Sequence, residues 1–121
     1  MLTSNLEDYL ECIYRLREES GLVSVTDIAD RMGVRAPSVT RAVKKLAREG
    51  YLFYEKYRGI ALTPEGERTG RFFSDRHETL RQLLLVIGVR DVADRVVEGI
   101  EHYIDGRNLG RIKSFLGRVK G

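Results

Sequence analysis

The sequence predicts a mainly α-helical protein that carries one short β-hairpin. Three observations lead to this fold class. Apolar residues recur at helical spacing over most of the 121 residues. Residues that favour helix starts (Ser, Thr, Asp) and glycines that favour helix ends divide these stretches into separate helices. Between residues 51 and 63, two β-prone segments flank a short Gly-containing connection, which indicates a hairpin.

The first two helices are expected to begin at capping boxes. Ser4 and Glu7 have this spacing at the start of a helix that continues as far as residues 21–22, and Ser24 and Asp27 have it at the start of the next. Gly33 is expected to end the second helix, because a glycine takes up the left-handed backbone of a C-cap without strain.

A third helix and the hairpin complete the pattern of a winged helix-turn-helix. Pro37 suits the first position of a helix, and Gly50 is expected to end that helix. Strands at 51–55 and 60–63 then pair through a tight connection at 56–59. A helix-turn-helix consists of two short helices joined by a tight turn, and here the second helix is basic, as in DNA-binding proteins. The hairpin that follows would be the wing.

Three further helices are expected after the wing. One begins with Thr63 as N-cap and runs to about Ile87, the next spans 91–104 and is stopped by Gly106, and the last begins at Asn108. Their apolar surface exceeds what one small lobe covers, which favours a helical dimer interface. We therefore expect a winged helix-turn-helix domain at 1–70 and metal-binding and dimerisation helices at 71–121.

Composition narrows the class of protein. Hydrophobic residues make up 42% and charged residues 32%, as in globular proteins. The longest apolar run, at 83–89, is far shorter than a membrane span, and the acidic N-terminus has no signal-peptide pattern. A single cysteine, Cys12, is typical of a reducing compartment and more probable as a packing residue than as a ligand. We expect a cytoplasmic protein that needs neither a membrane nor an organic cofactor.

Positive charge is concentrated in one block and one tail. The net charge is +3, yet residues 35–58 carry +5 and residues 107–121 carry five basic groups without an acid. The other residues therefore sum to −7. Such a block favours phosphate as a partner, with a solvated helix face as the alternative. The residues expected to contact double-stranded DNA are Arg35, Pro37, Ser38, Thr40, Arg41, Lys44, Lys45, Lys56 and Arg58.

Carboxylates and the two histidines form a candidate metal site. Glu98, Glu101 and His102 are at i, i+3 and i+4, a spacing that directs three side chains to one helical face. Asp8 and Glu11 share a face in the same way. Four clustered carboxylates would repel one another, and divalent cations would cancel that charge. The candidate donors are Asp8, Glu11, His77, Glu98, Glu101 and His102. The alternatives are an exposed acidic face for Asp8 and Glu11 and a surface position for His77. The donors at 98–102 could instead pair with Arg95 and Arg107.

Five stretches in order along the chain resemble the metal-dependent repressors of the diphtheria toxin repressor family, and most closely their manganese transport regulator branch. They are LEDYLECIY (6–14), SVTDIADRMGV (24–34), YEKYRGIALT (54–63), RHETL (76–80) and VEGIEHY (97–103). The resemblance implies a homodimer, operator DNA as partner and the six candidate donors as ligands of a binuclear manganese site. The sequence departs from the branch at Tyr103, where a second histidine is often found, and we expect no SH3-like domain of the kind found in the iron regulators.

The resemblance also suggests which metal is bound. Iron-responsive members typically have methionine at the position of Asp8 and cysteine at that of Glu98, so the oxygen donors here favour Mn²⁺. Two Mn²⁺ ions per subunit are expected, and Fe²⁺, Co²⁺, Zn²⁺ or Cd²⁺ are expected to be able to replace them. Metal held between the two lobes would set the spacing of the dimer's recognition helices and so control repression of metal-uptake genes.

Two other classes of function are compatible with parts of the sequence. Residues 98–102 resemble the HxxEH motif of inverted zinc peptidases, but glutamate replaces its first histidine, which argues against an enzyme. The stronger alternative is a winged-helix regulator that senses another metal or is not gated by metal.

Overall fold

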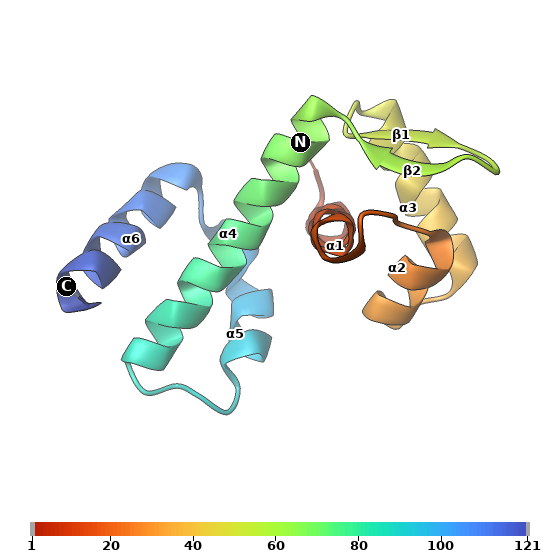
Figure 1. Ribbon diagram of the computed structural model, residues 1–121. Coiled ribbons are helices and arrows are strands. Elements are labelled where there is room, and N and C mark those ends of the chain that lie inside the picture. Colours follow the sequence, from red (N-terminus) through yellow and green to blue (C-terminus); the bar gives the residue numbers. More distant parts are fainter. Residues whose placement is uncertain (1, 121) are drawn as a thin grey trace. The chain divides into compact units, whose positions relative to one another are not determined.

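The computed structural model describes residues 2–120, and Figure 1 shows its elements along the chain. The elements are α1 (Ser4–Ser20), α2 (Val25–Met32), α3 (Ala36–Arg48), β1 (Leu52–Glu55), β2 (Gly59–Leu62), α4 (Pro64–Val86), α5 (Ala93–Ile100), the short 3₁₀ helix η1 (Glu101–Tyr103) and α6 (Gly106–Lys120). The predicted mainly α fold with a two-stranded wing is confirmed. The chain forms two compact units, which divide within α4 between Ser74 and Asp75.

Helix α1 is capped one residue earlier than the sequence suggested. Thr3 has an extended backbone, and its Oγ1 accepts a hydrogen bond from the Leu6 amide at 3.2 Å. Ser4 already lies inside the helix, so the predicted capping box of Ser4 and Glu7 is wrong. Threonine and serine are both good N-caps, and a sequence with the two side by side does not decide between them.

Helix α2 has the predicted caps. The Asp27 amide donates to Ser24 Oγ at 3.0 Å, and the Ser24 amide donates back to Asp27 Oδ2 at 3.3 Å. Gly33 ends the helix with a left-handed backbone, φ 66°. After this short turn α3 begins at Ala36, so that Pro37 lies in its first turn, where its missing N–H leaves no helical hydrogen bond unmade.

The wing is a two-stranded antiparallel hairpin. Leu52 pairs with Leu62 at its base and Glu55 pairs with Gly59 at its far end. The Arg58 amide donates to the Glu55 carbonyl at 3.0 Å and closes the turn. The observed strands thus differ by only a residue at their ends from the predicted 51–55 and 60–63.

The core of the first unit is built from one apolar face of each element. The innermost side chains come from α1, α2, α3 and β1, and they are Leu10, Ile13, Ile28, Val39, Val43, Leu46 and Leu52. Burying these faces gives the hydrophobic driving force that joins the elements. The opposite face of α3 is left to solvent.

The first turn of α4 joins the first unit through close backbone contacts. Thr63 Oγ1 accepts from the Gly66 amide at 3.0 Å and donates to the Gly50 carbonyl at 2.6 Å. A Cβ on Gly66 would lie 1.9 Å from the Tyr51 carbonyl oxygen. Only glycine therefore allows this approach between α4 and the start of the wing.

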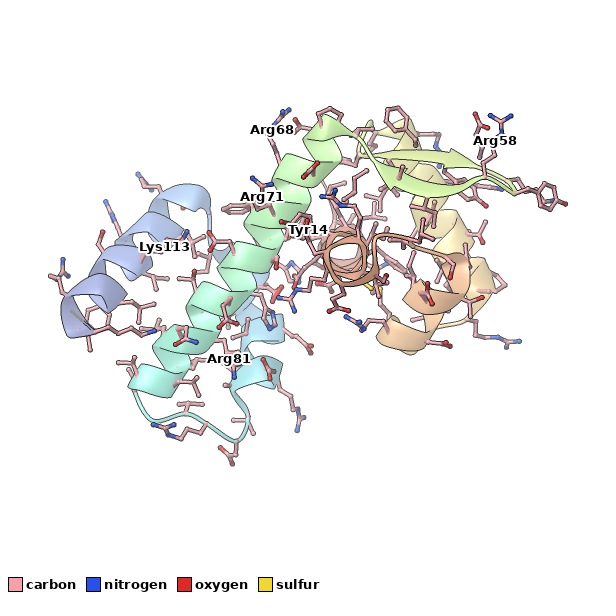
Figure 2. The ribbon with its side chains drawn as sticks, in the orientation of Figure 1. Tyr14, Arg58, Arg68, Arg71, Arg81 and Lys113 are labelled. Atoms are coloured by element: carbon pink, nitrogen blue, oxygen red, sulfur yellow. The ribbon has the colours of Figure 1, made fainter. Side chains whose placement is uncertain are left out.

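Tyr14 links α1 to the next turns of α4 within the same unit. A Cβ on Gly70 would lie 2.7 Å from Tyr14 Cβ, so the two helices touch there. The Tyr14 hydroxyl accepts from Arg71 Nε at 3.4 Å, and Figure 2 labels both residues. Arg17 adds an ion pair with Glu67 at 2.8 Å. These contacts order the N-terminal half of α4.

The second unit has a smaller core of its own. Its central cluster of buried apolar residues is formed by Leu80, Leu84, Ala93 and Val97, from α4 and α5. Helix α6 is tied to α4 by an ion pair of Lys113 with Asp75 and by a hydrogen bond from Lys120 Nζ to Gln82 Oε1 at 2.7 Å. Residues distant in sequence thus hold the three helices together.

The helix predicted at 91–104 is interrupted. Helix α5 ends at Ile100 and the chain tightens into η1. Asp105 then caps α6, with Oδ1 accepting from the Asn108 amide at 2.8 Å. Gly106 therefore begins a helix instead of stopping one, and the predicted start at Asn108 is wrong. Aspartate is a strong N-cap, and its effect outweighs the glycine signal.

The helices of the second half are amphipathic and not uniformly apolar. No helix within residues 2–120 has both the length and the apolar character needed to cross a membrane.

Candidate functional site

The outer face of α3 is a row of cations. Burial of Val39, Val43 and Leu46 fixes the rotation of the helix about its axis, and the residues between them are turned outward. The exposed residues are Arg35, Pro37, Arg41, Lys44, Lys45 and Arg48, and Ser38 and Thr40 are half-buried. Positive charge on the second helix of a helix-turn-helix suits contact with DNA.

A cleft of about 600 Å³ separates α3 from the wing. Its lining residues are Thr40, Lys44, Ala47, Arg48, Tyr54 and Lys56. Three of these are cations, so the cleft suits a sugar-phosphate strand. Arg48 and Tyr54 were not among the predicted DNA contacts. Arg48 lies four residues after Lys44 and hence on the same helical face, a signal that was available in the sequence.

The turn of the wing presents the other predicted contacts. Lys56 and Arg58 are both exposed. Arg58 Nε lies 3.4 Å from Glu55 Oε2, an ion pair in full contact with solvent. Such a pair contributes little to stability, so Arg58 is available to other anions.

In the second unit, His77 lies between two carboxylates. Its Nδ1 is 2.9 Å from Glu101 Oε2, and its Nε2 is 3.4 Å from Asp94 Oδ1. Glu101 is only 1% exposed and His77 is also buried. A neutral imidazole has one N–H and can donate to one carboxylate only. Arg81 Nε lies 3.6 Å from Asp94 Oδ1 and offsets part of the negative charge there. The Glu101 carboxylate and the His77 ring are oxygen and nitrogen donors of the kind that bind a divalent cation.

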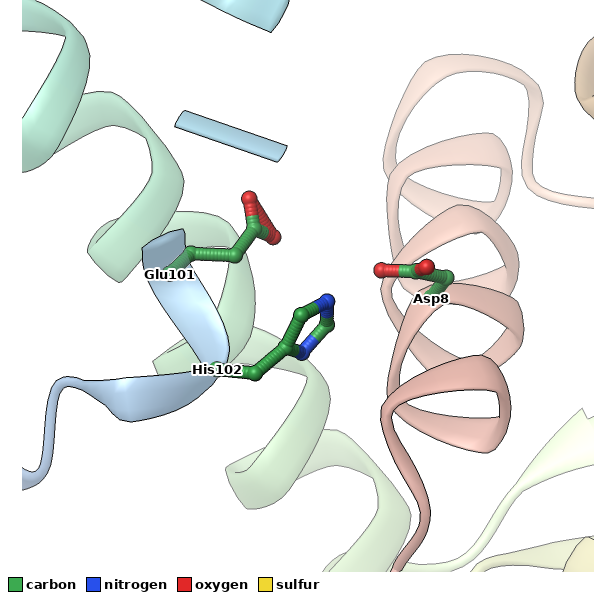
Figure 3. A group of neighbouring side chains, drawn as sticks. All are labelled: Asp8, Glu101 and His102. Atoms are coloured by element: carbon green, nitrogen blue, oxygen red, sulfur yellow. The ribbon is translucent and has the colours of Figure 1, made fainter. Parts of the chain in front are cut away.

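His102 adds a second imidazole to the cluster. A ring nitrogen of His102 and a carboxylate oxygen of Glu101 lie within 4.8 Å of each other. Figure 3 shows both side chains on η1, and it shows Asp8 on α1. The neighbouring Tyr103 is 84% exposed. Glu101 is thus the donor that joins His77 to His102.

Glu98 is placed differently from the other candidate donors. It is exposed, and within residues 2–120 it belongs to no group of three or more close donors. The i, i+3, i+4 spacing shares one face on a continuous α-helix, whereas the chain changes to a 3₁₀ helix at Glu101. A 3₁₀ helix has three residues per turn, so the spacing by itself does not place Glu98 on the face of His102.

The two donors of α1 belong to the first unit. Asp8 and Glu11 are one helical turn apart, and Glu11 Oε2 accepts an ion pair from Arg15 at 2.9 Å. Cys12 packs in the core beside them, as predicted. Burial raises the pKa of the Cys12 thiol to about 11, so it is protonated at neutral pH. The thiolate is the form that binds metal, so burial disfavours Cys12 as a ligand, and the candidate donors are oxygen and imidazole.

Asp94 was not among the predicted donors, yet it faces His77 together with Glu101. It lies seven residues before Glu101, whereas the candidate donors within each helix are three or four residues apart. A spacing of seven residues also returns to the same helical face, and this is the one signal of Asp94 in the sequence.

Known proteins resemble the chain over nearly its whole length. Residues 1–60 match the family model of the iron dependent repressor N-terminal DNA binding domain, and residues 63–121 match that of the iron dependent repressor metal binding and dimerisation domain. The HTH-type transcriptional regulator MntR of Bacillus pumilus is 47% identical over 114 residues, covering 93% of this chain and 78% of the relative. The MntR of Bacillus subtilis is 46% identical over 113 residues, covering 93% and 80%.

A solved structure described as a manganese-dependent transcriptional repressor in complex with manganese has the same fold. Its TM-score is 0.82 at 30% sequence identity, covering 93% of this chain and 52% of that one. The chain thus spans about half the length of this solved protein. These relatives are transcriptional regulators, and the hydrolase alternative is wrong. Since two consecutive models of one family account for both halves of the sequence, the chain belongs to the iron-dependent repressor family, the family of the diphtheria toxin repressor.

Proposed function

We propose that this chain is a manganese-responsive repressor that binds operator DNA in the cytoplasm as a homodimer and controls metal-uptake genes. The observation that carries this proposal is the presence of two features in one chain: a cation-lined surface of α3 and the wing, and a buried imidazole–carboxylate cluster at His77 and Glu101. Relatives named as MntR regulators support the same function.

In the first unit, the start of α3 reads base edges. The N-terminal residues of a recognition helix are the ones that reach into the major groove. For base contacts we propose Arg35, Pro37, Ser38 and Arg41. For phosphate contacts we propose Thr40, Lys44, Lys45, Lys56 and Arg58. The cation-lined cleft between α3 and the wing supports this division, because it includes Thr40 and two of these lysines.

The candidate donors fit a hard divalent cation. They offer carboxylate oxygen and imidazole nitrogen, and the neighbouring thiol of Cys12 is protonated at neutral pH. We propose that two ions per subunit are held by Asp8, Glu11, His77, Glu98, Glu101 and His102. A bound cation supplies positive charge that offsets the repulsion among these carboxylates. Fe²⁺, Co²⁺, Zn²⁺ and Cd²⁺ are able to occupy the same donors.

Because the proposed ligands come from both units, metal binding is coupled to DNA binding. Asp8 and Glu11 belong to the helix-turn-helix unit, and the other donors belong to the unit that dimerises. Half-sites one turn of DNA apart require recognition helices about 34 Å apart. Residues that bind one cluster of ions jointly restrict the two units to fewer arrangements, and the ion acts by its higher affinity for the DNA-competent one.

The test is DNA binding as a function of metal. Operator-like duplexes are first selected from random-sequence DNA by the wild-type protein with Mn²⁺. Fluorescence anisotropy then measures affinity for them in EDTA, Mn²⁺, Fe²⁺ and Zn²⁺. We expect tight binding with Mn²⁺ and at least tenfold weaker binding in EDTA. Equal affinity in all four conditions would show that the protein is a winged-helix regulator that does not sense metal. Tighter binding with another ion than with Mn²⁺ would show that this other ion is the activating metal.

The ligand set is tested by His77→Ala and Glu101→Gln, with Glu78→Gln as matched control. Glu78 lies next to His77 but is exposed and pairs with Arg81 at 3.3 Å. We expect the first two variants to lose manganese-dependent DNA binding and to bind Mn²⁺ about 100-fold more weakly by titration calorimetry. The Glu78→Gln variant should behave as wild type. A full manganese response of His77→Ala would show that the ligand set is wrong.

A further inference from the structure

Tyr57 stands at the end of the wing in a conformation that tyrosine seldom adopts. Its φ is +72°, and of the described residues it is the one non-glycine residue with positive φ. The hydrogen bond from the Arg58 amide to the Glu55 carbonyl makes Tyr57 the third residue of a four-residue turn. With positive φ at this position, the turn is of the type that favours glycine or asparagine there.

An unfavourable backbone conformation at a non-glycine residue persists only where the surrounding structure or a function of its side chain requires that residue. The side chain of Tyr57 is 92% exposed, so no buried packing in the hairpin accounts for a tyrosine. The next glycine, Gly59, has φ +98° and shows that the sequence does use glycine in this turn where the backbone requires it. A backbone outlier without a structural reason points to a function of the side chain.

The surroundings of Tyr57 suit DNA. Lys56 Nζ lies 5.3 Å from the centre of the Tyr57 ring, and Arg58 is the next residue along the turn, so the ring has one cation beside it and a second adjacent in sequence. Lys56 also lines the cleft beside α3, which places the turn at the edge of the proposed DNA surface. With α3 in the major groove, a strand of backbone fits the cleft and the turn beyond it reaches the adjacent minor groove. Minor-groove proteins combine cations with an apolar side chain in this way.

We propose that Tyr57 inserts its ring into the minor groove of the operator, where it contacts sugar and base edges between the cations of Lys56 and Arg58. This inference rests on the proposed function. It explains why a strained tyrosine replaces the glycine that the turn prefers: the folded state loses stability at this residue and the complex with DNA gains a contact.

The decisive variant is Tyr57→Gly, because strain and DNA contact predict opposite effects. Glycine relieves the backbone, so the thermal unfolding midpoint should equal or exceed that of the wild type. Loss of the ring should weaken binding to the selected duplex by about tenfold in Mn²⁺. Tyr57→Phe keeps the ring and should bind within about threefold of wild type. Unchanged affinity of Tyr57→Gly would overturn the proposal, and so would a loss of affinity accompanied by a lower midpoint.

Phe53→Ala is the matched control. Phe53 is another exposed aromatic residue of the wing, 62% exposed, and it neighbours Tyr54, which lines the cleft. Successive side chains of a strand point to opposite faces, so Phe53 faces away from α3. Its removal should leave affinity within about twofold of wild type. Equal losses in Phe53→Ala and Tyr57→Gly would indicate a general effect on the wing and contradict a specific role for Tyr57.

A direct readout comes from Tyr57→Trp, because the chain has no other tryptophan. We expect its emission to shift to shorter wavelength or to be quenched when the duplex is added with Mn²⁺, and distamycin, which occupies the minor groove, to compete. An indole that stays water-exposed in the saturated complex would overturn the proposal. If the wild-type protein selects no DNA with any metal, the proposed function itself fails; if it binds and the Tyr57 variants bind equally well, only this inference fails.

Discussion

Asp94 Oδ1 lies 3.4 Å from Nε2 of His77 and occupies the ring nitrogen that Glu101 does not. The carboxylate of Asp94 is mostly exposed, whereas that of Glu101 is buried. His77 is thus fixed at both nitrogens, and only one of them is needed for a metal. In metal sites the second nitrogen of a histidine ligand usually donates to a carboxylate, which sets the orientation of the ring.

We predict that Asp94→Asn weakens Mn²⁺ binding by about tenfold without abolishing it. The amide keeps the size of the side chain but removes the charge that orients the imidazole. Titration calorimetry measures the affinity, and the Mn²⁺ electron paramagnetic resonance spectrum reports altered coordination symmetry. Asp91→Asn, a change at an exposed aspartate outside the cluster, should match wild type. Equal affinities of the two variants would show that Asp94 does not position His77.

For the DNA surface we predict that Lys44→Ala and Arg41→Ala change different properties: the first lowers affinity for every duplex, and the second lowers the preference for one duplex over another. A phosphate contact carries no sequence information, so Lys44→Ala should weaken binding to all duplexes alike and reduce the salt dependence by about one unit of log–log slope. A base contact discriminates, so Arg41→Ala should lower the preference for the selected duplex over random DNA by about 1–3 kcal/mol. Anisotropy at several salt concentrations separates the two.

The control for these variants is Arg90→Ala, an exposed cation that follows α4 and lies outside the proposed DNA surface. It should change neither the slope nor the preference. Identical behaviour of all three variants would mean that binding depends only on the total charge of the protein, and it would remove the assignment of base contacts to α3.

The sequence predicts a structural feature well when that feature is decided by residues that are neighbours in the chain. The caps of α2 at Ser24 and Gly33 were predicted correctly because a cap is decided by a few neighbouring residues. The start of α1 was misplaced by one residue because Thr3 and Ser4 have similar capping strength. The break before η1 was missed, since the sequence around Glu101 still reads as an amphipathic helix.

The same dependence on neighbouring residues explains which residues of the candidate metal site were predicted from the sequence. His77 and Glu101 were found because histidines are rare in this chain and carboxylates at helical spacing are visible. Asp94 was missed because a spacing of seven residues is a weak signal by itself, and its position beside His77 depends on the packing of α5 against α4. The conformation of Tyr57 depends on the register of the hairpin, and a one-residue difference in the strand ends would move it.

Replacing two helical glycines by alanine should change the free energy of unfolding in opposite directions. Gly66→Ala places a Cβ 1.9 Å from the Tyr51 carbonyl oxygen, a rigid neighbour, and should reduce the free energy of unfolding by about 1–3 kcal/mol or more. Gly110 lies inside α6 with no atom within 4 Å of the added Cβ, so Gly110→Ala should raise it by about 0.5–1 kcal/mol. Urea denaturation measures both, and a stable Gly66→Ala protein would contradict the close approach of α4 to the wing.

Cys12 should make stability fall at high pH. Burial raises the pKa of its thiol from 9.0 to about 11, so the unfolded chain releases this proton at lower pH than the folded protein. Below pH 9 the thiol is protonated in both states and its contribution to stability is complete. As the pH rises towards 11 only the unfolded state ionises, and the free energy of unfolding should drop by about 2 kcal/mol from this group.

Other groups also titrate in that range, so the prediction concerns a difference between proteins. Urea denaturation of wild type and Cys12→Ala, in reducing buffer at pH 8 and pH 10.5, should show a larger loss in the wild type by about 2 kcal/mol. Alanine cannot ionise, and it therefore removes this dependence while it lowers stability at both pH values through the lost packing. Parallel pH profiles for the two proteins would mean that the thiol titrates normally in the folded chain.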